Sequence, residues 1–226
     1  MNLTAIFLLV KLFLSPSVPI NTIVEKAPET THRTVEWVIS DFLQPEKTDV
    51  TISGHPKVID CKYGQAVLFN GKDDGIFVDQ MPLKGLKAFT IEILIRYDSG
   101  GNFEQRYFHC GEVKGNRILM EMRSNPTNWY LDTYVKSDAG NNPLISPDLT
   151  HPLDQWYHVA FVVENGKQVN YIDGKKELEG EIGFSPIMTG QTSIGVRQNK
   201  VAWFKGAIYK IRITDKTLSP SEFMDH

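Results

Sequence analysis

The chain has 226 residues, of which 41% are hydrophobic, and it carries a formal net charge of −3. This length and apolar content can bury a sizeable core, which excludes a disordered protein and fits one large domain or at most two small ones. The 24 basic residues are outnumbered by 27 acidic ones, so no bulk positive field favours nucleic acid. Two cysteines are too few for a disulfide-dense miniprotein or a self-contained zinc module.

The first predicted element is an apolar run from Ile6 to Leu14, which only Lys11 interrupts. It is too short to cross a bilayer as a helix, so we expect no integral membrane span. The small residues Ser15-Pro16-Ser17 that follow complete the order of parts found in a secretory signal peptide. We therefore predict a signal peptide or leader over residues 1–20, a linker over 21–33, and a secreted, periplasmic or extracellular protein. Because no positive charge precedes the run, a leader without a targeting role stays open as the alternative.

Strand patterns fill the rest of the chain. In four segments apolar residues alternate with polar ones, as they do in a half-buried strand. Asn165-Gly166 and Asp173-Gly174 are hairpin-turn dipeptides between or after such segments. The residues predicted to face a core are Phe89, Ile91, Ile93, Ile95 and Tyr97; Trp129, Leu131, Thr133 and Val135; Tyr157, Val159, Phe161 and Val163; and Ala207, Tyr209, Ile211 and Ile213.

The order of these elements predicts an all-β fold. Parallel α/β sheets need crossover helices, and no helical period separates the strands. We predict an antiparallel architecture over residues 34–220, either a two-sheet β-sandwich or a closed barrel, followed by a tail over 221–226. Helix is expected only at the margins, where Ser219-Pro220-Ser221-Glu222 has the form of a capping box. Residues 35–42 fit either an amphipathic helix or an irregular first strand.

Four segments, taken in order, resemble the motifs of one family, and together they cover about residues 40–215. They resemble the laminin-G-like jelly-roll domains of the concanavalin A-like lectin/glucanase superfamily. The resemblance implies a two-sheet β-sandwich, but it fixes no function, because the family contains glycan binders, adhesion modules and appendages of enzymes. The segments are Gly64-Gln65-Ala66-Val67-Leu68-Phe69-Asn70-Gly71; Phe89-Thr90-Ile91-Glu92; Gln155-Trp156-Tyr157-His158-Val159-Ala160 with Tyr171-Ile172-Asp173-Gly174; and Thr192-Ser193-Ile194-Gly195 with Phe204-Lys205-Gly206-Ala207-Ile208.

The best candidate for a binding face lies on neighbouring predicted strands, on the side that faces away from the core. Aromatic rings pack against the apolar faces of sugars, and charged groups form strong hydrogen bonds with sugar hydroxyls. The alternative is that these residues form cross-strand pairs that only stabilise an exposed sheet. The predicted carbohydrate-binding residues are Glu121, Arg123, Tyr130, Asp132, Tyr134 and His109.

A second hypothesis gives the chain a chemical activity. A polysaccharide lyase needs groups that neutralise a uronate and a His or Tyr that removes a proton from the sugar. Gln105, Arg123, Tyr130 and His109 have the residue types for those roles, but their order along the chain does not match the lyase motifs. The alternating Glu-x-Asp-x-x-Glu carboxylates of retaining glucanases are absent from the sequence. We therefore favour a binding module over a lyase or glycoside hydrolase.

The loop after Asn70 concentrates oxygen ligands. Asp73 and Asp74 precede Gly75, and Asp79 follows closely. Calcium takes about six to eight oxygen ligands, and the resemblance implies a calcium site at the loop rim of some members. The three aspartates are therefore candidate calcium ligands, although Asp and Gly are also ordinary turn residues. No other cofactor is predicted.

The two cysteines, Cys61 and Cys110, can form one disulfide in an oxidising compartment. We predict this disulfide together with export, because the two depend on each other. In a reducing compartment both side chains would stay free, as small buried groups.

These observations predict an exported lectin-like module that binds carbohydrate or a glycosylated partner through one sheet face or the loop rim. A polysaccharide-degrading enzyme and a non-catalytic module that adheres to a protein partner remain the alternatives.

Overall fold

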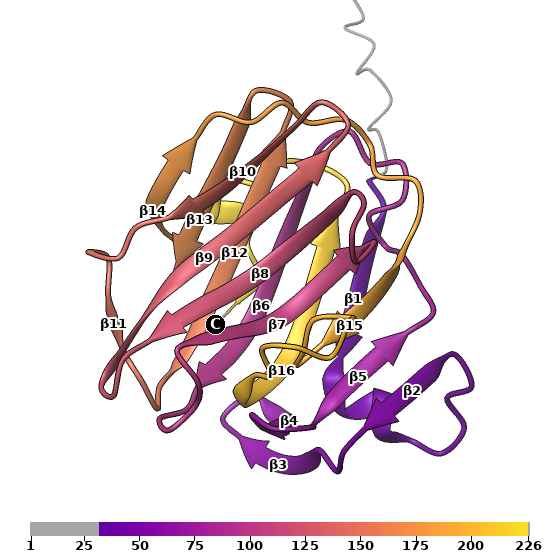
Figure 1. Cartoon of the computed structure of the whole chain (residues 1–226), viewed down its shortest axis with the longest axis vertical. Helices are drawn as coiled ribbons and strands as arrows, with labels where there is room; N and C mark the ends of the chain where they lie inside the picture. The colour runs from indigo at the N-terminus through magenta and orange to yellow at the C-terminus, as the bar shows by residue number, and fades with distance from the viewer. Residues whose placement is uncertain (1–31, 226) are drawn as a thin grey trace, which may run out of the picture. The chain divides into compact units, whose positions relative to one another are not determined.

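The computed structural model describes residues 32–225; the predicted leader and most of the predicted linker lie outside this range. None of the helices in this range is long and apolar enough to cross a membrane. Sixteen strands and two 3-10 helices make up its regular structure (Figure 1). They are β1 (Thr34–Val38), η1 (Ile39–Leu43), β2 (Val50–Ser53), β3 (Lys57–Cys61), β4 (Gly64–Asn70), β5 (Gly75–Val78), β6 (Phe89–Tyr97), β7 (Glu104–Gly111), β8 (Arg117–Ser124), β9 (Asn128–Ser137), β10 (Gly140–Ile145), β11 (His151–Pro152), β12 (Trp156–Glu164), β13 (Lys167–Ile172), β14 (Lys175–Gly180), β15 (Gln191–Ile194), β16 (Lys205–Thr214) and η2 (Pro220–Glu222).

Within residues 32–225 the strands form two sheets of eight strands each. Sheet A has the order β14-β13-β12-β6-β16-β4-β3, and β1 also pairs with β16. Sheet B has the order β10-β9-β8-β7-β15-β5-β2, and β11 also pairs with β9. Figure 1 shows sheet B as a layer in front of sheet A. The predicted all-β class and the antiparallel sandwich are confirmed, and the closed barrel is wrong.

The core lies between the two sheets, where the predicted alternation places it. Ile91 and Ile93 of β6 are fully buried, as is Trp129 of β9 on the facing sheet. The layers meet in aromatic contacts, and the ring centroids of Tyr97 and Trp129 lie 3.9 Å apart. Burying a large apolar side chain stabilises a fold by about 1.5–3 kcal/mol, so these inward residues hold the sandwich together.

The outward face of β6 is also buried, which corrects the prediction of a half-buried strand. The segment after β16 crosses this face: the Thr90 hydroxyl donates to the carbonyl of Lys216 at 2.8 Å and accepts from the Leu218 amide at 2.8 Å. Farther along, the amide of Met224 donates to the Glu92 carboxylate at 2.7 Å. The C-terminal segment therefore replaces water over the middle of sheet A.

Two β-bulges break the strict alternation on which the sequence prediction depended. Pairing with β8 shifts between Arg106 and Phe108, and pairing of β16 with β6 shifts between Ile208 and Lys210. An extra residue in a strand reverses which side chains face the core beyond it. Strict alternation would place Arg106 on the face opposite His109, and it would place Tyr209 in the core. Instead Arg106 pairs with Glu121 on the outer face of sheet B, and Tyr209 is partly exposed on sheet A.

Three local predictions, for the first segment, the C-terminal helix and one hairpin turn, can be compared with the structure. Residues 35–42 combine both open alternatives, because strand β1 continues into helix η1. The capping box at η2 is confirmed: the amide of Ser219 donates to the Glu222 carboxylate at 2.9 Å. The hairpin between β13 and β14 turns at Asp173-Gly174, and both residues have the positive φ that a type I′ turn requires.

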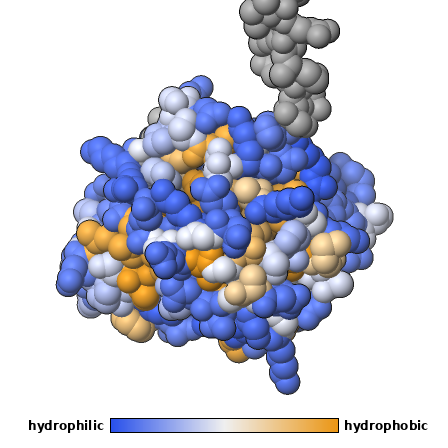
Figure 2. All heavy atoms as spheres, turned by 90° about the horizontal axis from the view of Figure 1, so that it is seen from above, coloured by the Kyte–Doolittle hydropathy of each residue, from blue (hydrophilic) through white to orange (hydrophobic). Residues whose placement is uncertain are grey.

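Figure 2 shows one end of the sandwich, where hydrophilic side chains separate the hydrophobic ones into patches. Within residues 32–225, the large hydrophobic side chains that stay exposed come from separate segments; they are Ile52, Val58, Phe103, Met188 and Val201.

Candidate functional site

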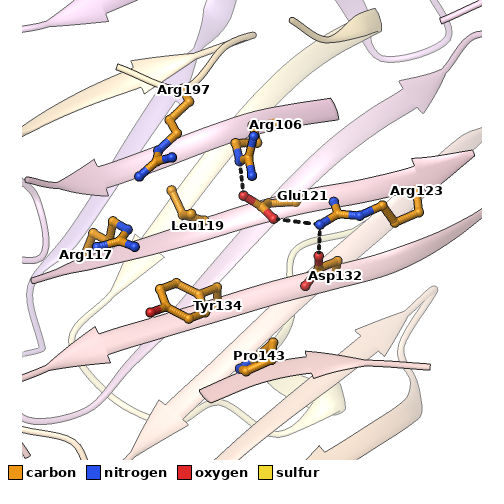
Figure 3. Close-up of a pocket in the computed structure, with 9 residues that line it drawn as sticks. All are labelled: Arg106, Arg117, Leu119, Glu121, Arg123, Asp132, Tyr134, Pro143 and Arg197. Carbon is orange, nitrogen blue, oxygen red and sulfur yellow. Dashed lines mark hydrogen bonds and ion pairs between the residues drawn. The ribbon is translucent and has the colours of Figure 1, made fainter. Parts of the chain in front are cut away.

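The outer face of sheet B carries a hollow with a volume of about 210 Å³. Strands β7 to β10 and the loop after β15 form it, and Figure 3 shows how their side chains converge. Four of its nine lining residues are arginines and two are carboxylates, so charge dominates its chemistry. The lining residues are Arg106, Arg117, Leu119, Glu121, Arg123, Asp132, Tyr134, Pro143 and Arg197.

Strand register brings opposite charges into a row across three strands. Glu121 of β8 pairs with Arg106 of β7 on one side and with Asp132 of β9 on the other. The Nε atom of Arg106 contacts the Glu121 carboxylate. The Nη2 atom of Arg123 lies 3.4 Å from Glu121 Oε2 and 2.6 Å from Asp132 Oδ2. We call Arg106, Glu121, Arg123 and Asp132 the charge ladder; its members fix one another in position.

The charge ladder is sheltered from water, and this changes the proton affinity of Asp132. Burial, and then the charge of Glu121, raise the pKa of Asp132 from 3.8 to about 7, although Arg123 opposes the rise. The two carboxylates therefore hold less than two negative charges near neutral pH.

Two arginines of the hollow have no carboxylate partner within 4.0 Å in residues 32–225. Arg117 donates to the carbonyl of Gly115 at 2.8 Å, and its guanidinium lies 5.0 Å from the centre of the Tyr134 ring. Arg197 donates to the carbonyl of Val113 at 2.8 Å. The Nε atoms of both arginines are buried and lack an acceptor in the described chain.

The structure brings four of the six predicted binding residues to the hollow: Glu121, Arg123, Asp132 and Tyr134. Tyr130 lies on the same face, opposite Arg123, but does not line the hollow. Along β9, Tyr130 and Tyr134 lie four residues apart, one on either side of Asp132, and cannot form one continuous aromatic platform. The arrangement therefore favours recognition by charged groups over recognition by stacked rings.

His109 is the predicted residue that the structure places elsewhere. Its side chain is fully buried beneath the loop after β15, where the amide of Gln198 donates to Nδ1 at 3.3 Å and Nε2 lies 3.3 Å from the carbonyl of Glu112. Burial lowers the pKa of His109 to about 3. The neutral ring therefore joins two loops and has no access to a ligand in the hollow.

Arg106, Arg117 and Arg197 were missed as binding residues. The bulge hid Arg106, because strict alternation turns it away from Glu121. Arg197 lies in a loop, whose position no periodic pattern gives. Arg117 had a usable signal, since extending the alternation from Arg123 through Glu121 reaches it on the same face.

The three candidate calcium ligands do not converge. Both oxygens of Asp74 accept backbone amides, from His55 at 2.7 Å and Asn70 at 2.9 Å, and Asp73 accepts from the Asn70 side chain. Asp79 instead accepts from Gln191 at 3.0 Å. No group of three or more His, Cys, Asp or Glu residues able to hold a metal occurs in residues 32–225. The Asp74 carboxylate thus stabilises the conformation of its loop by accepting these two amides.

The predicted disulfide is wrong, because both cysteines are free thiols. Cys61 ends β3 in sheet A and pairs with Gly64, which lies against the Tyr209 ring on the outer face. Cys110 points into the core from sheet B. Sheet A thus separates the two sulfur atoms, and a disulfide requires neighbouring Cα atoms about 4–7 Å apart.

A cluster of aromatic residues that the sequence did not suggest lies on the outer face of sheet A. The rings of Tyr63 and Tyr209 are stacked with centroids 5.7 Å apart, and Trp156 meets Tyr63 edge-on at 5.7 Å. A turn, a strand end and the bulge of β16 supply these residues. Their assembly therefore depends on tertiary structure alone.

Comparison with known proteins places the fold in a family. The laminin-G family model described as the concanavalin A-like lectin/glucanases superfamily matches residues 70–223. No curated protein matches the chain significantly.

Several solved structures share the fold. Domain 4 of AbnA, an extracellular GH43 arabinanase from Geobacillus stearothermophilus solved with arabinotriose, is 22% identical with a TM-score of 0.52, over 76% of this chain and 85% of that chain. The binding domain of botulinum neurotoxin serotype D is 14% identical with a TM-score of 0.59, over 76% and 44%. A SAP-like pentraxin from Limulus polyphemus is 20% identical with a TM-score of 0.50, over 69% and 77%.

The chain spans less than half of the toxin structure, and all three identities are low enough that the likeness concerns the fold alone. The family model, in contrast, covers most of the chain. The four sequence motifs, the two-layer antiparallel architecture and this match agree, and the chain belongs to the concanavalin A-like lectin/glucanase superfamily.

Proposed function

We propose that this domain binds carbohydrate in the hollow on the outer face of sheet B and catalyses no reaction there. The observation that carries the proposal is the convergence of fixed charged donors and acceptors in one open hollow. Sugars present many hydroxyls, and ionised groups form the strongest hydrogen bonds with them. The charge ladder holds its side chains in place before a ligand arrives, which reduces the entropy lost on binding.

A solved structure with this fold supports the proposal. Domain 4 of the arabinanase was solved with arabinotriose, so this architecture can present a sugar site. The apolar run at residues 6–14 supports export to a compartment where glycans are displayed.

The geometry favours binding over lyase chemistry. His109 is buried and neutral, and it cannot reach a proton on a sugar in the hollow. The Gln105 side chain is also fully buried; it accepts from the Lys205 amide at 2.8 Å and donates to the Asn102 carbonyl at 2.8 Å. Two of the four candidate lyase residues, His109 and Gln105, therefore have structural contacts that leave them unavailable.

A glycan array followed by titration calorimetry tests this function. We expect the wild-type domain to bind a defined subset of glycans, and Tyr134→Ala to weaken that binding about tenfold or more, since it removes a wall of the hollow and the support of Arg117. Tyr209→Ala, on the outer face of sheet A, is the matched control and should keep full affinity. Absence of any glycan ligand, or loss of binding in Tyr209→Ala alone, would refute the proposed site.

A further inference from the structure

One end of the hollow is built differently from the charge ladder. Three guanidinium groups surround the Leu119 side chain there: Arg106 from β7, Arg117 from the start of β8, and Arg197 from the loop after β15 (Figure 3). Because Leu119 is apolar and only 4% exposed, it offers these groups no counter-charge. We call Arg106, Arg117, Arg197 and Leu119 the arginine corner.

The charges in the arginine corner are only partly balanced. Glu121 and Glu104 contact Arg106, whereas Arg117 and Arg197 have no acidic partner in the described chain. Each uses a guanidinium nitrogen on a backbone carbonyl of the β7–β8 loop, which fixes its direction. Their buried Nε atoms remain without acceptors. Both side chains are partly exposed and line the hollow, so their remaining guanidinium N–H groups can donate to a ligand oxygen placed here.

The positive charges of these three guanidinium groups repel one another, and the pKa of Arg197 reflects this repulsion. Burial, and then the charges of Arg106 and Arg117, lower the pKa of Arg197. Perturbed charged groups cluster at functional sites, so this crowding of guanidinium groups supports a binding role for the corner.

We propose that the arginine corner binds the carboxylate of an acidic sugar, so that the ligand is a uronate-containing glycan. This inference rests on the proposed carbohydrate site and names its ligand class. A planar carboxylate accepts parallel hydrogen bonds from guanidinium groups, which match its geometry. The sugar ring that carries the carboxylate would lie over Leu119 and beside Tyr134, and its hydroxyls would reach the charge ladder.

The test compares three sets of oligosaccharides of equal length by calorimetry at fixed ionic strength: uronate oligomers, the same oligomers after reduction of their carboxyl groups, and sulfated neutral oligomers. We expect the uronate form to bind at least about tenfold more tightly than its reduced counterpart, as loss of charge-assisted hydrogen bonds implies. The double variant Arg117→Gln with Arg197→Gln should lose this preference and keep the weak affinity for the reduced form. That residual binding also reports that the hollow is still folded.

Lys136→Gln is the matched control. Lys136 lies opposite Arg117 on the same face, outside the hollow, and donates to the carbonyl of Lys114 at 3.1 Å. This variant removes a neighbouring positive charge and leaves all three arginines of the corner unsubstituted. An equal loss of preference in Lys136→Gln would indicate general attraction and overturn the defined site.

The remaining outcomes separate the two proposals. Equal affinity for uronate and reduced oligomers would overturn the carboxylate site and leave the carbohydrate site standing. Tighter binding of the sulfated oligomers would also overturn the carboxylate. Failure of all three sets to bind, with a positive glycan array, would overturn the uronate class alone, whereas failure on the array as well would overturn both proposals.

Discussion

At the scale of single residues, the hollow shows how neighbours decide what a side chain does. Asp132 faces outward, as its place in the strand pattern predicts, yet it is only 3% exposed because Arg123 and the adjacent strands shelter it. One oxygen of Asp132 contacts Arg123, and the other is buried without a donor. A proton on this carboxyl is therefore favoured in the folded protein.

The proton on the Asp132 carboxyl should make the free energy of unfolding depend on pH. In the unfolded chain Asp132 titrates near pH 3.8, and in the folded protein near pH 7. Between these values the folded state holds a proton that the unfolded state has lost, so the free energy of unfolding falls as pH rises through this window and is constant above it. Asp132→Asn removes this group from the titration. We expect urea unfolding to show that, between pH 4.5 and pH 7.5, the free energy of unfolding of the wild type falls by about 2–4 kcal/mol relative to that of the variant. The size follows because one pKa unit corresponds to about 1.4 kcal/mol. A difference that does not change with pH would contradict the assignment.

At the scale of elements, the C-terminal segment is part of the sandwich. Buried Glu92 of β6 links it to sheet A, because this carboxylate accepts from the Met224 amide and from Arg212 at 2.6 Å, and lies 3.0 Å from His158. Burial raises the pKa of Glu92, but hydrogen bonds from His158, Arg212 and Met224 outweigh burial, so the net pKa lies below 4.5. The ionised Glu92 carboxylate thus binds the C-terminal segment to sheet A.

Replacing this carboxylate should loosen the C-terminal segment. We expect Glu92→Gln to lower the free energy of unfolding by about 3 kcal/mol at pH 7, because the buried partners of Glu92 lose their counter-charge. Since the folded pKa is lowered, this contribution is present above pH 4.5 and lost as pH falls below it, so wild type and variant should converge in acid. Thermal and urea melts at pH 7 and pH 3.5 provide the measurement. The half-exposed Glu36, which lies 3.6 Å from Lys210, gives the control Glu36→Gln, and a loss equal to that of Glu92→Gln would argue against a special role for burial.

At the scale of the whole molecule, two sheets close over a core without a disulfide between them. Cys61 and Cys110 lie on different sheets and on opposite sides of sheet A, so the layers are held by packing of the core and by the chain segments that cross between them. Burial raises the pKa of the Cys110 thiol to about 11. Cys61 is partly exposed.

Thiol titration distinguishes these two environments. We expect one thiol, Cys61, to react with a thiol reagent in the native protein, because only an accessible thiolate reacts. Two thiols should react in denaturant without reductant, and Cys61→Ser should remove the fast native reaction. A denatured protein that shows no reactive thiol would contradict the free state of both cysteines.

The sequence by itself determined the layers of this protein. A period of two in segments such as Phe89–Tyr97 and turn dipeptides such as Asp173-Gly174 are local properties, and they predicted strands, hairpins and an antiparallel sandwich or barrel. The resemblance of four motifs to one family then implied the sandwich. The same alternation placed Glu121, Arg123, Asp132 and Tyr134 on one outer face, because neighbours two residues apart must share a face.

Only the tertiary structure decided which of these residues form a site. A bulge turned Arg106 toward Glu121, a loop from a distant part of the chain placed Arg197 in the same hollow, and burial withdrew His109 from it. Periodicity carries no information about an inserted residue or about the path of a loop. The pairing of Cys61 and Cys110 failed for the same reason, since spacing along a chain does not reveal that a sheet stands between two side chains.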